Sequence, residues 1–92
     1  MAERTRAHVL ITGTVQGVFY RVRTREAARQ RRVAGWVQNL PDGRVEAVFE
    51  GDRAAVEEMI RWCETGSPRA VVEDVTVTTD SPQGITGFEI RR

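Results

Sequence analysis

One nine-residue segment combines the residue types that a phosphate-binding turn needs: GTVQGVFYR, at positions 13–21. It joins a predicted strand to a predicted helix. Its last residues therefore form a helix N-terminus, where backbone N–H groups lack intrahelical partners and the helix dipole favours an anion. Gly17 allows the backbone to approach a ligand closely. Arg21, in the first helical turn, adds a permanent charge and a planar fork that matches phosphate oxygens. The segment predicts an anion site, and a purely structural turn is the alternative interpretation.

Other kinds of chemistry find little support in the sequence. The glycine spacing differs from G-x-x-x-x-G-K-[ST], and all 14 basic residues are arginine, which excludes a nucleotide P-loop and lysine-dependent catalysis. His8 is the only histidine and Cys63 the only cysteine, so neither a metal site nor an internal disulfide is expected. We expect no metal and no cofactor.

Asn39 is the second residue that could act on a ligand. It stands near the end of a predicted strand and just before the turn signal Pro41-Asp42-Gly43, although asparagine is uncommon in strands. Two interpretations stay open at this point: its amide either hydrogen-bonds the turn backbone or holds a water molecule or ligand. In a β-α-β-β unit this strand returns beside the first helix, which could bring Asn39 close to Arg21.

The hydrophobic patterns predict the elements that must position these residues. Strands are predicted at 8–13, 33–40, 44–50, 71–79 and 88–90, and helices at 19–32 and from the N-cap Asp52 to Gly66-Ser67-Pro68. This order, βαββαβ with a short additional C-terminal strand, predicts an α+β fold of the ferredoxin-like sandwich type. Its antiparallel sheet carries two helices on one face and has the first and third strands at its centre.

The same patterns predict which faces are buried. In the third strand the apolar Val45, Ala47 and Phe49 share one side, with Arg44, Glu46 and Glu50 largely on the other. In the helices, two groups of residues form the stripes that should face the sheet: Thr24, Ala27, Ala28 and the stem of Arg31; and Ala55, Val56, Met59, Ile60 and Cys63.

Length and composition favour one small globular domain, residues 1–92. Hydrophobic residues make up 40% of the chain and charged residues 29%, and the net charge is +1. This balance gives no overall field that would attract nucleic acid or an anionic membrane, and no apolar run approaches the ~20 residues of a membrane span. We expect a cytoplasmic monomer.

Two motifs together resemble the acylphosphatase family. Residues 13–21 are similar to the family's G-x-V-Q-G-V-x-[aromatic]-R, and residues 35–51 are similar to G-[aromatic]-V-x-N-x-x-x-G-x-V-x(5)-G. The resemblance extends to the closing segment 87–91 and so covers nearly the whole chain. One departure is Arg31-Arg32, where the family often has Leu-Gly, and it leaves the capping of the first helix open.

The resemblance implies an enzyme that hydrolyses acyl phosphates, which are mixed anhydrides of a carboxylic acid and phosphate. It assigns the orientation of the attacking water to Asn39 and places Arg21 on the phosphate. It also assigns phosphate binding to the loop from Gln16 to Arg21, which consists of Gln16, Gly17, Val18, Phe19, Tyr20 and Arg21. The expected partner is a small acyl phosphate.

Two other functions are compatible with this order of elements. An RNA-recognition module would need aromatic residues on its two central strands, but residues 8–11 contain none and the third strand has only Phe49. A non-catalytic sensor of a phosphorylated metabolite could use the same anion site. It would need no residue like Asn39 to hold water, so turnover of an acyl phosphate separates the two.

Overall fold

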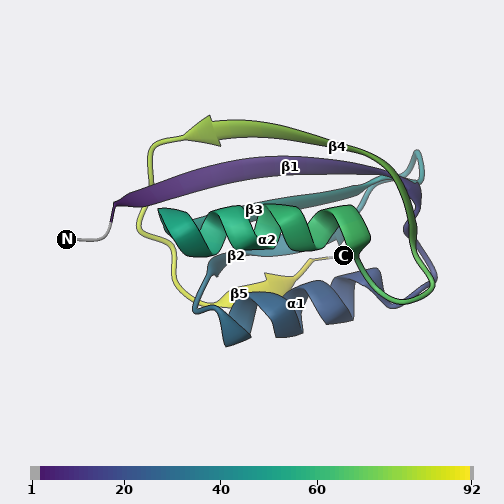
Figure 1. Cartoon of the computed structure of the whole chain (residues 1–92), viewed down its shortest axis with the longest axis horizontal. Coiled ribbons are helices and arrows are strands. Elements are labelled where there is room, and N and C mark those ends of the chain that lie inside the picture. The colour runs from purple at the N-terminus through teal and green to yellow at the C-terminus, as the bar shows by residue number, and fades with distance from the viewer. Residues whose placement is uncertain (1–2, 92) are drawn as a thin grey trace.

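The computed structural model describes residues 3–91 and contains five strands and two helices (Figure 1). The elements are β1 (Arg4–Thr14), α1 (Tyr20–Gln30), β2 (Ala34–Asn39), β3 (Val45–Asp52), α2 (Arg53–Thr65), β4 (Val71–Asp80) and β5 (Phe88–Ile90). No helix in this part of the chain is long and apolar enough to cross a membrane.

The strands form one sheet in the order β4-β1-β3-β2-β5. β1 and β3 lie at its centre, and the pairings among the first four strands are antiparallel, as predicted. β5 adds to the edge beside β2 in parallel orientation, which makes the sheet mixed. The predicted ferredoxin-like sandwich is confirmed.

Both helices cover the same face of the sheet. Alternate residues of β1 and β3 point towards them, and Val9, Phe49, Ala28 and Met59 are fully buried in one apolar cluster. The predicted stripe of α1 is confirmed, because Thr24, Ala27 and Ala28 are buried. The sheet and helices thereby form a rigid support for the loops at their ends.

The helix ends differ from the prediction by one or two residues. α1 begins at Tyr20 because Phe19 is in the left-handed region, with φ of 62°, and it ends before Arg32, where φ is 57°. Asp52 is the N-cap of α2 as predicted, but its carboxylate makes no capping hydrogen bond. The Arg53 N–H instead donates to the Glu3 carbonyl at 2.7 Å.

Glu50 contradicts the prediction that its side of β3 faces solvent, because its side chain is fully buried. The segment connecting β4 to β5 crosses this end of the sheet, and its N–H groups at Gln83, Gly84 and Ile85 donate to Glu50 Oε1 at 2.6–3.2 Å. Arg6 donates to Oε2 at 3.0 Å. Burial alone would raise the pKa of Glu50, but these four donors outweigh it and hold that pKa below its usual value.

Candidate functional site

The segment between β1 and α1 leaves a series of backbone N–H groups unused. The first bond of the helix runs from the Arg23 N–H to the Phe19 carbonyl at 3.1 Å, so no earlier N–H in the helix has an intrahelical acceptor. Within the described residues, the N–H groups of residues 16–22 donate to no other backbone group. Seven successive donors at a helix N-terminus are suited to an anion.

Glycine shapes both ends of this segment. At Gly13, where a bulge shifts the pairing of β1 with β4, φ is 136° and an added Cβ would lie 2.1 Å from the Val71 carbonyl oxygen. No other residue type fits there. At Gly17 φ is 75° and the space around it is open, so the backbone is exposed to an approaching ligand.

A cleft of about 570 Å³ lies beside these N–H groups, and we call it the loop cleft. Its residues come from the loop, α1, the end of β2 and the end of β5. They are Val15, Gly17, Phe19, Tyr20, Arg21, Val22, Asn39 and Ile90. Arg21 and Asn39, 18 positions apart in the sequence, therefore line the same cleft.

Asn39 is the last residue of β2, and its Oδ1 atom is buried with no hydrogen-bond partner among residues 3–91. The adjacent turn closes without it: the Leu40 N–H donates to the Arg44 carbonyl at 2.8 Å, and the Arg44 N–H donates to Asp42 at 3.1 Å. The turn-holding interpretation therefore has no bond to support it. A buried acceptor without a partner is costly unless water or a ligand satisfies it.

Gln16 and Val18, which the sequence placed in the phosphate loop, do not line the cleft. The Gln16 side-chain amide donates to the carbonyls of Leu40 and Arg44 at 2.8 and 2.9 Å, which ties the loop to the hairpin that carries Asn39. Val18 packs against the apolar core. Only the backbone N–H groups of these two residues are left for a ligand.

The Tyr20 side chain is also structural. It is buried, donates to the Cys63 carbonyl at 2.8 Å and packs edge-to-face against Trp62 at 5.5 Å. Burial, reinforced by the nearby Cys63, raises the pKa of Tyr20 far above its usual value, so the phenol does not act as a general acid at neutral pH. Cys63 is itself buried, and burial raises its pKa to about 12, which removes it as a nucleophile.

Three apolar residues of the cleft were not predicted as site residues: Val15, Val22 and Ile90. Ile90 reaches the cleft because β5 pairs with β2, opposite Val37. No short-range pattern in the sequence indicates that pairing. In the described part of the chain, no group of three His, Cys, Asp or Glu side chains is placed to hold a metal ion.

Comparisons with known proteins agree with the two sequence motifs. The acylphosphatase family model matches residues 7–90. The acylphosphatase of Haloquadratum walsbyi is 66% identical over 89 residues, 97% of this chain and 96% of the relative. That of Natronomonas pharaonis is 62% identical over 92 residues, the full length of both. Among solved structures, an acylphosphatase from Bacillus subtilis is similar with a TM-score of 0.93 at 36% identity, covering 96% of this chain and 99% of that chain. The chain therefore belongs to the acylphosphatase family.

Proposed function

We propose that this acylphosphatase binds the phosphate of an acyl phosphate on the backbone N–H groups of residues 16–21 and the Arg21 guanidinium, and that Asn39 orients the attacking water. One observation carries the proposal: Arg21, Asn39 and the loop residues Gly17, Phe19 and Tyr20 line one cleft, where the loop N–H groups are unused and Asn39 Oδ1 has no partner among residues 3–91. A phosphate oxyanion satisfies the N–H groups and Arg21, and a water molecule between Asn39 and phosphorus satisfies Oδ1.

The chemistry asks little of the protein beyond position and charge. In a loose transition state the three equatorial oxygens of the phosphoryl group stay negative, and fixed N–H donors with Arg21 stabilise that charge without having to reorganise. Water attacks phosphorus, and the bond from phosphorus to the acyl oxygen breaks. The carboxylate leaves with the electron pair, and the water proton passes to a phosphate oxygen of the substrate.

No general acid is needed for this reaction because a carboxylate is a weak base and leaves unprotonated. This agrees with the residues of the cleft, since Tyr20 is buried and its phenol faces Cys63 rather than the ligand. The loop also offers no Cys or Asp nucleophile, so we propose direct hydrolysis without a phosphoenzyme. The scheme needs no metal, and EDTA should leave the rate unchanged.

We place the acyl group against the apolar side of the loop cleft. Four large hydrophobic side chains are exposed in the described part of the chain, and two of them, Phe19 and Val22, line this cleft. Phe19 is 72% exposed, and its backbone is in the left-handed region, which is unfavourable for a residue other than glycine. Ile90 lines the same cleft. An apolar or aromatic acyl group would cover these residues and release water from them.

Hydrolysis of benzoyl phosphate by Arg21→Ala tests the proposed site. We expect kcat/KM to fall about 10²–10³-fold, the usual loss for one transition-state donor, and competitive inhibition by orthophosphate to disappear. Arg23→Ala is the matched control, because Arg23 lies on the same helix, is exposed and pairs with Glu26. A folded Arg21→Ala enzyme with the turnover of the parent would remove Arg21 from the mechanism.

The same assay distinguishes the enzyme from a metabolite sensor, since a sensor would bind orthophosphate without turning over any acyl phosphate. We further propose that the enzyme works as a cytoplasmic monomer, since its single cysteine is buried and offers no disulfide to a second chain. Light scattering should return the mass of one chain.

A further inference from the structure

The region of α1 carries far more positive than negative charge. Residues 21–32 contain six arginines and one acidic residue, Glu26, in a chain whose net charge is only +1. Two of these arginines have carboxylate partners: Arg23 lies 3.4 Å from Glu26 and Arg31 lies 3.7 Å from Glu58 on α2. The other four have no carboxylate within ion-pair distance among residues 3–91, and they are Arg21, Arg25, Arg29 and Arg32.

We call these four residues the arginine stripe: three of them follow one side of the helix, and Arg32 lies just beyond its end. Arg21, Arg25 and Arg29 are spaced four residues apart, which places them on neighbouring turns of the same face. At 1.5 Å per residue the stripe extends about 12 Å from Arg21 to Arg29. Its first member lines the loop cleft. Arg25 is half-buried.

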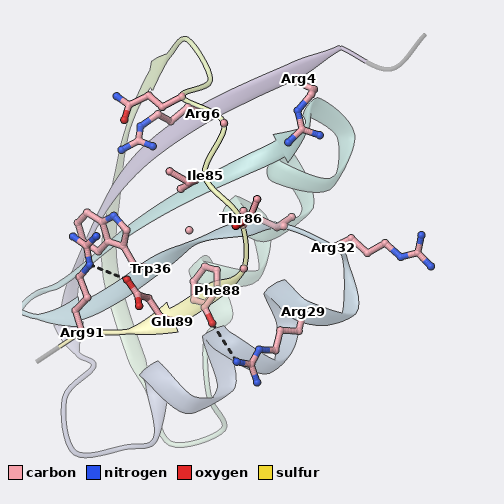
Figure 2. A pocket seen from close by; sticks show the side chains of 16 residues that line it. Arg4, Arg6, Arg29, Arg32, Trp36, Ile85, Thr86, Phe88, Glu89 and Arg91 are labelled. Atoms are coloured by element: carbon pink, nitrogen blue, oxygen red, sulfur yellow. Dashed lines mark hydrogen bonds and ion pairs between the residues drawn. The ribbon is translucent and has the colours of Figure 1, made fainter.

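The far end of the stripe lies at a second and larger cleft of about 1060 Å³. Arg29 and Arg32 line it together with Arg4 (Figure 2). Figure 2 shows these three on one side of the segment that contains Ile85 and Thr86, with Trp36 and Arg91 on the other side. Arg29 donates to the Phe88 carbonyl at 3.3 Å, and most of its N–H groups stay available.

Folding does not explain this arrangement. Arg32 has a φ of 57°, a conformation in which glycine is unstrained and arginine is not. Like charges four residues apart on a helix repel each other, and each arginine of the stripe adds to that repulsion. An anionic ligand would remove the repulsion. Because the charges are spread along a line and do not converge on one point, the matching ligand is linear and carries several charges.

We propose that the arginine stripe binds a linear oligophosphate chain whose terminal phosphate occupies the phosphate loop. The inference rests on the proposed function, because that end of the chain uses Arg21 and the N–H groups of residues 16–21. Guanidinium groups bind phosphates with paired hydrogen bonds, and the phosphates beyond the terminal one extend from the loop towards Arg25 and then Arg29. A free oligophosphate and the triphosphate of a nucleotide share this chemistry.

The test is competitive inhibition of benzoyl phosphate hydrolysis by orthophosphate, pyrophosphate, tripolyphosphate and ATP, in metal-free buffer at low salt. A basic residue beside a phosphate surface contributes about fivefold in affinity, so the inhibition constant of tripolyphosphate should lie at least about tenfold below that of orthophosphate. Added salt should reduce the difference. Tighter binding of ATP than of tripolyphosphate would identify a nucleotide as the ligand, and equal or weaker binding a free oligophosphate.

Substitutions within and outside the stripe locate the effect. The double variant Arg25→Gln/Arg29→Gln should bind orthophosphate like the parent. Its inhibition constants should no longer change with the length of the phosphate chain. Arg23→Gln/Arg53→Gln is its matched control, because it removes the same charge from two exposed arginines that have carboxylate partners. Arg29 donates to the Phe88 carbonyl on β5, so its substitution could also loosen that strand. The single variant Arg25→Gln controls for this effect, because Arg25 makes no hydrogen bond to β5 among residues 3–91.

The proposal fails if the inhibition constants do not change with chain length, or if the Arg25→Gln/Arg29→Gln enzyme keeps the dependence of the parent. Failure of the proposed function gives a different result. In that case orthophosphate would not compete with substrate, while calorimetry would still show tripolyphosphate binding that Arg25→Gln/Arg29→Gln weakens.

Discussion

Replacing Asn39 with alanine should separate catalytic activity from stability. If its amide oxygen orients the attacking water, Asn39→Ala loses one transition-state interaction, and kcat should fall about 10²–10³-fold. KM should change little, because the phosphate is bound by Arg21 and the loop N–H groups. Removing a polar residue from a partly buried site usually destabilises a protein.

For Asn39→Ala the structure indicates no loss in the free energy of unfolding. The Asn39 Oδ1 is buried and accepts no hydrogen bond within residues 3–91, so the folded protein bears a desolvation cost of about 1–3 kcal/mol wherever water does not satisfy the atom. Alanine keeps Cβ and removes the amide group, so that cost disappears together with the packing contacts of the amide atoms. We therefore expect the free energy of unfolding to stay equal or to rise by up to about 1–2 kcal/mol.

Urea denaturation and benzoyl phosphate hydrolysis, measured on the same preparations, test both parts. Gln38→Ala is the control, because Gln38 precedes Asn39 on β2, donates to Glu46 and does not line the loop cleft. That variant should keep its kcat. An Asn39→Ala protein that is less stable by about 1 kcal/mol or more and still fully active would refute our reasoning and restore a turn-holding role for Asn39.

Three further predictions concern groups that hold the scaffold. Because the pKa of Glu50 is lower in the folded state, its contribution to stability is present above the unfolded value of about 4.3 and is lost as pH falls towards the folded value. Urea titrations from pH 6 to pH 3 should show a flatter decline for Glu50→Gln than for the parent. Gly66→Ala should lower the free energy of unfolding by about 2–4 kcal/mol in thermal melts, because φ is 68° and the new Cβ would lie 2.3 Å from the Tyr20 ring. Gly84→Ala, where φ is 80° and the space is open, should lower it by only about 1 kcal/mol. Cys63, with its pKa raised to about 12 by burial, should resist a thiol reagent at pH 8 until denaturant is added, and rapid labelling of the folded protein would contradict its burial.

The local chemistry of the chain determined much of its architecture and its candidate site. The order of the elements follows from alternation in strands such as β3 and from the helical stripe that contains Thr24 and Ala28. The two motifs indicated Arg21 and Asn39, which line the same cleft in the structure. The order of the elements was predicted correctly because it depends on residue spacing within each element, and such spacing can be recognised in the sequence alone.

Long-range pairing decided the rest, because no residue carries information about partners that lie far away in the sequence. The parallel docking of β5 on β2 brought Ile90 to the loop cleft. The segment before β5 crosses the sheet and buries Glu50, whose position in an alternating strand predicted exposure. Only the packing of α2 beside α1 determined that Arg31 has a carboxylate partner and that Arg25 and Arg29 have none among the described residues. Sequence spacing specifies which side of an element a residue faces, whereas the tertiary fold determines what lies opposite that side.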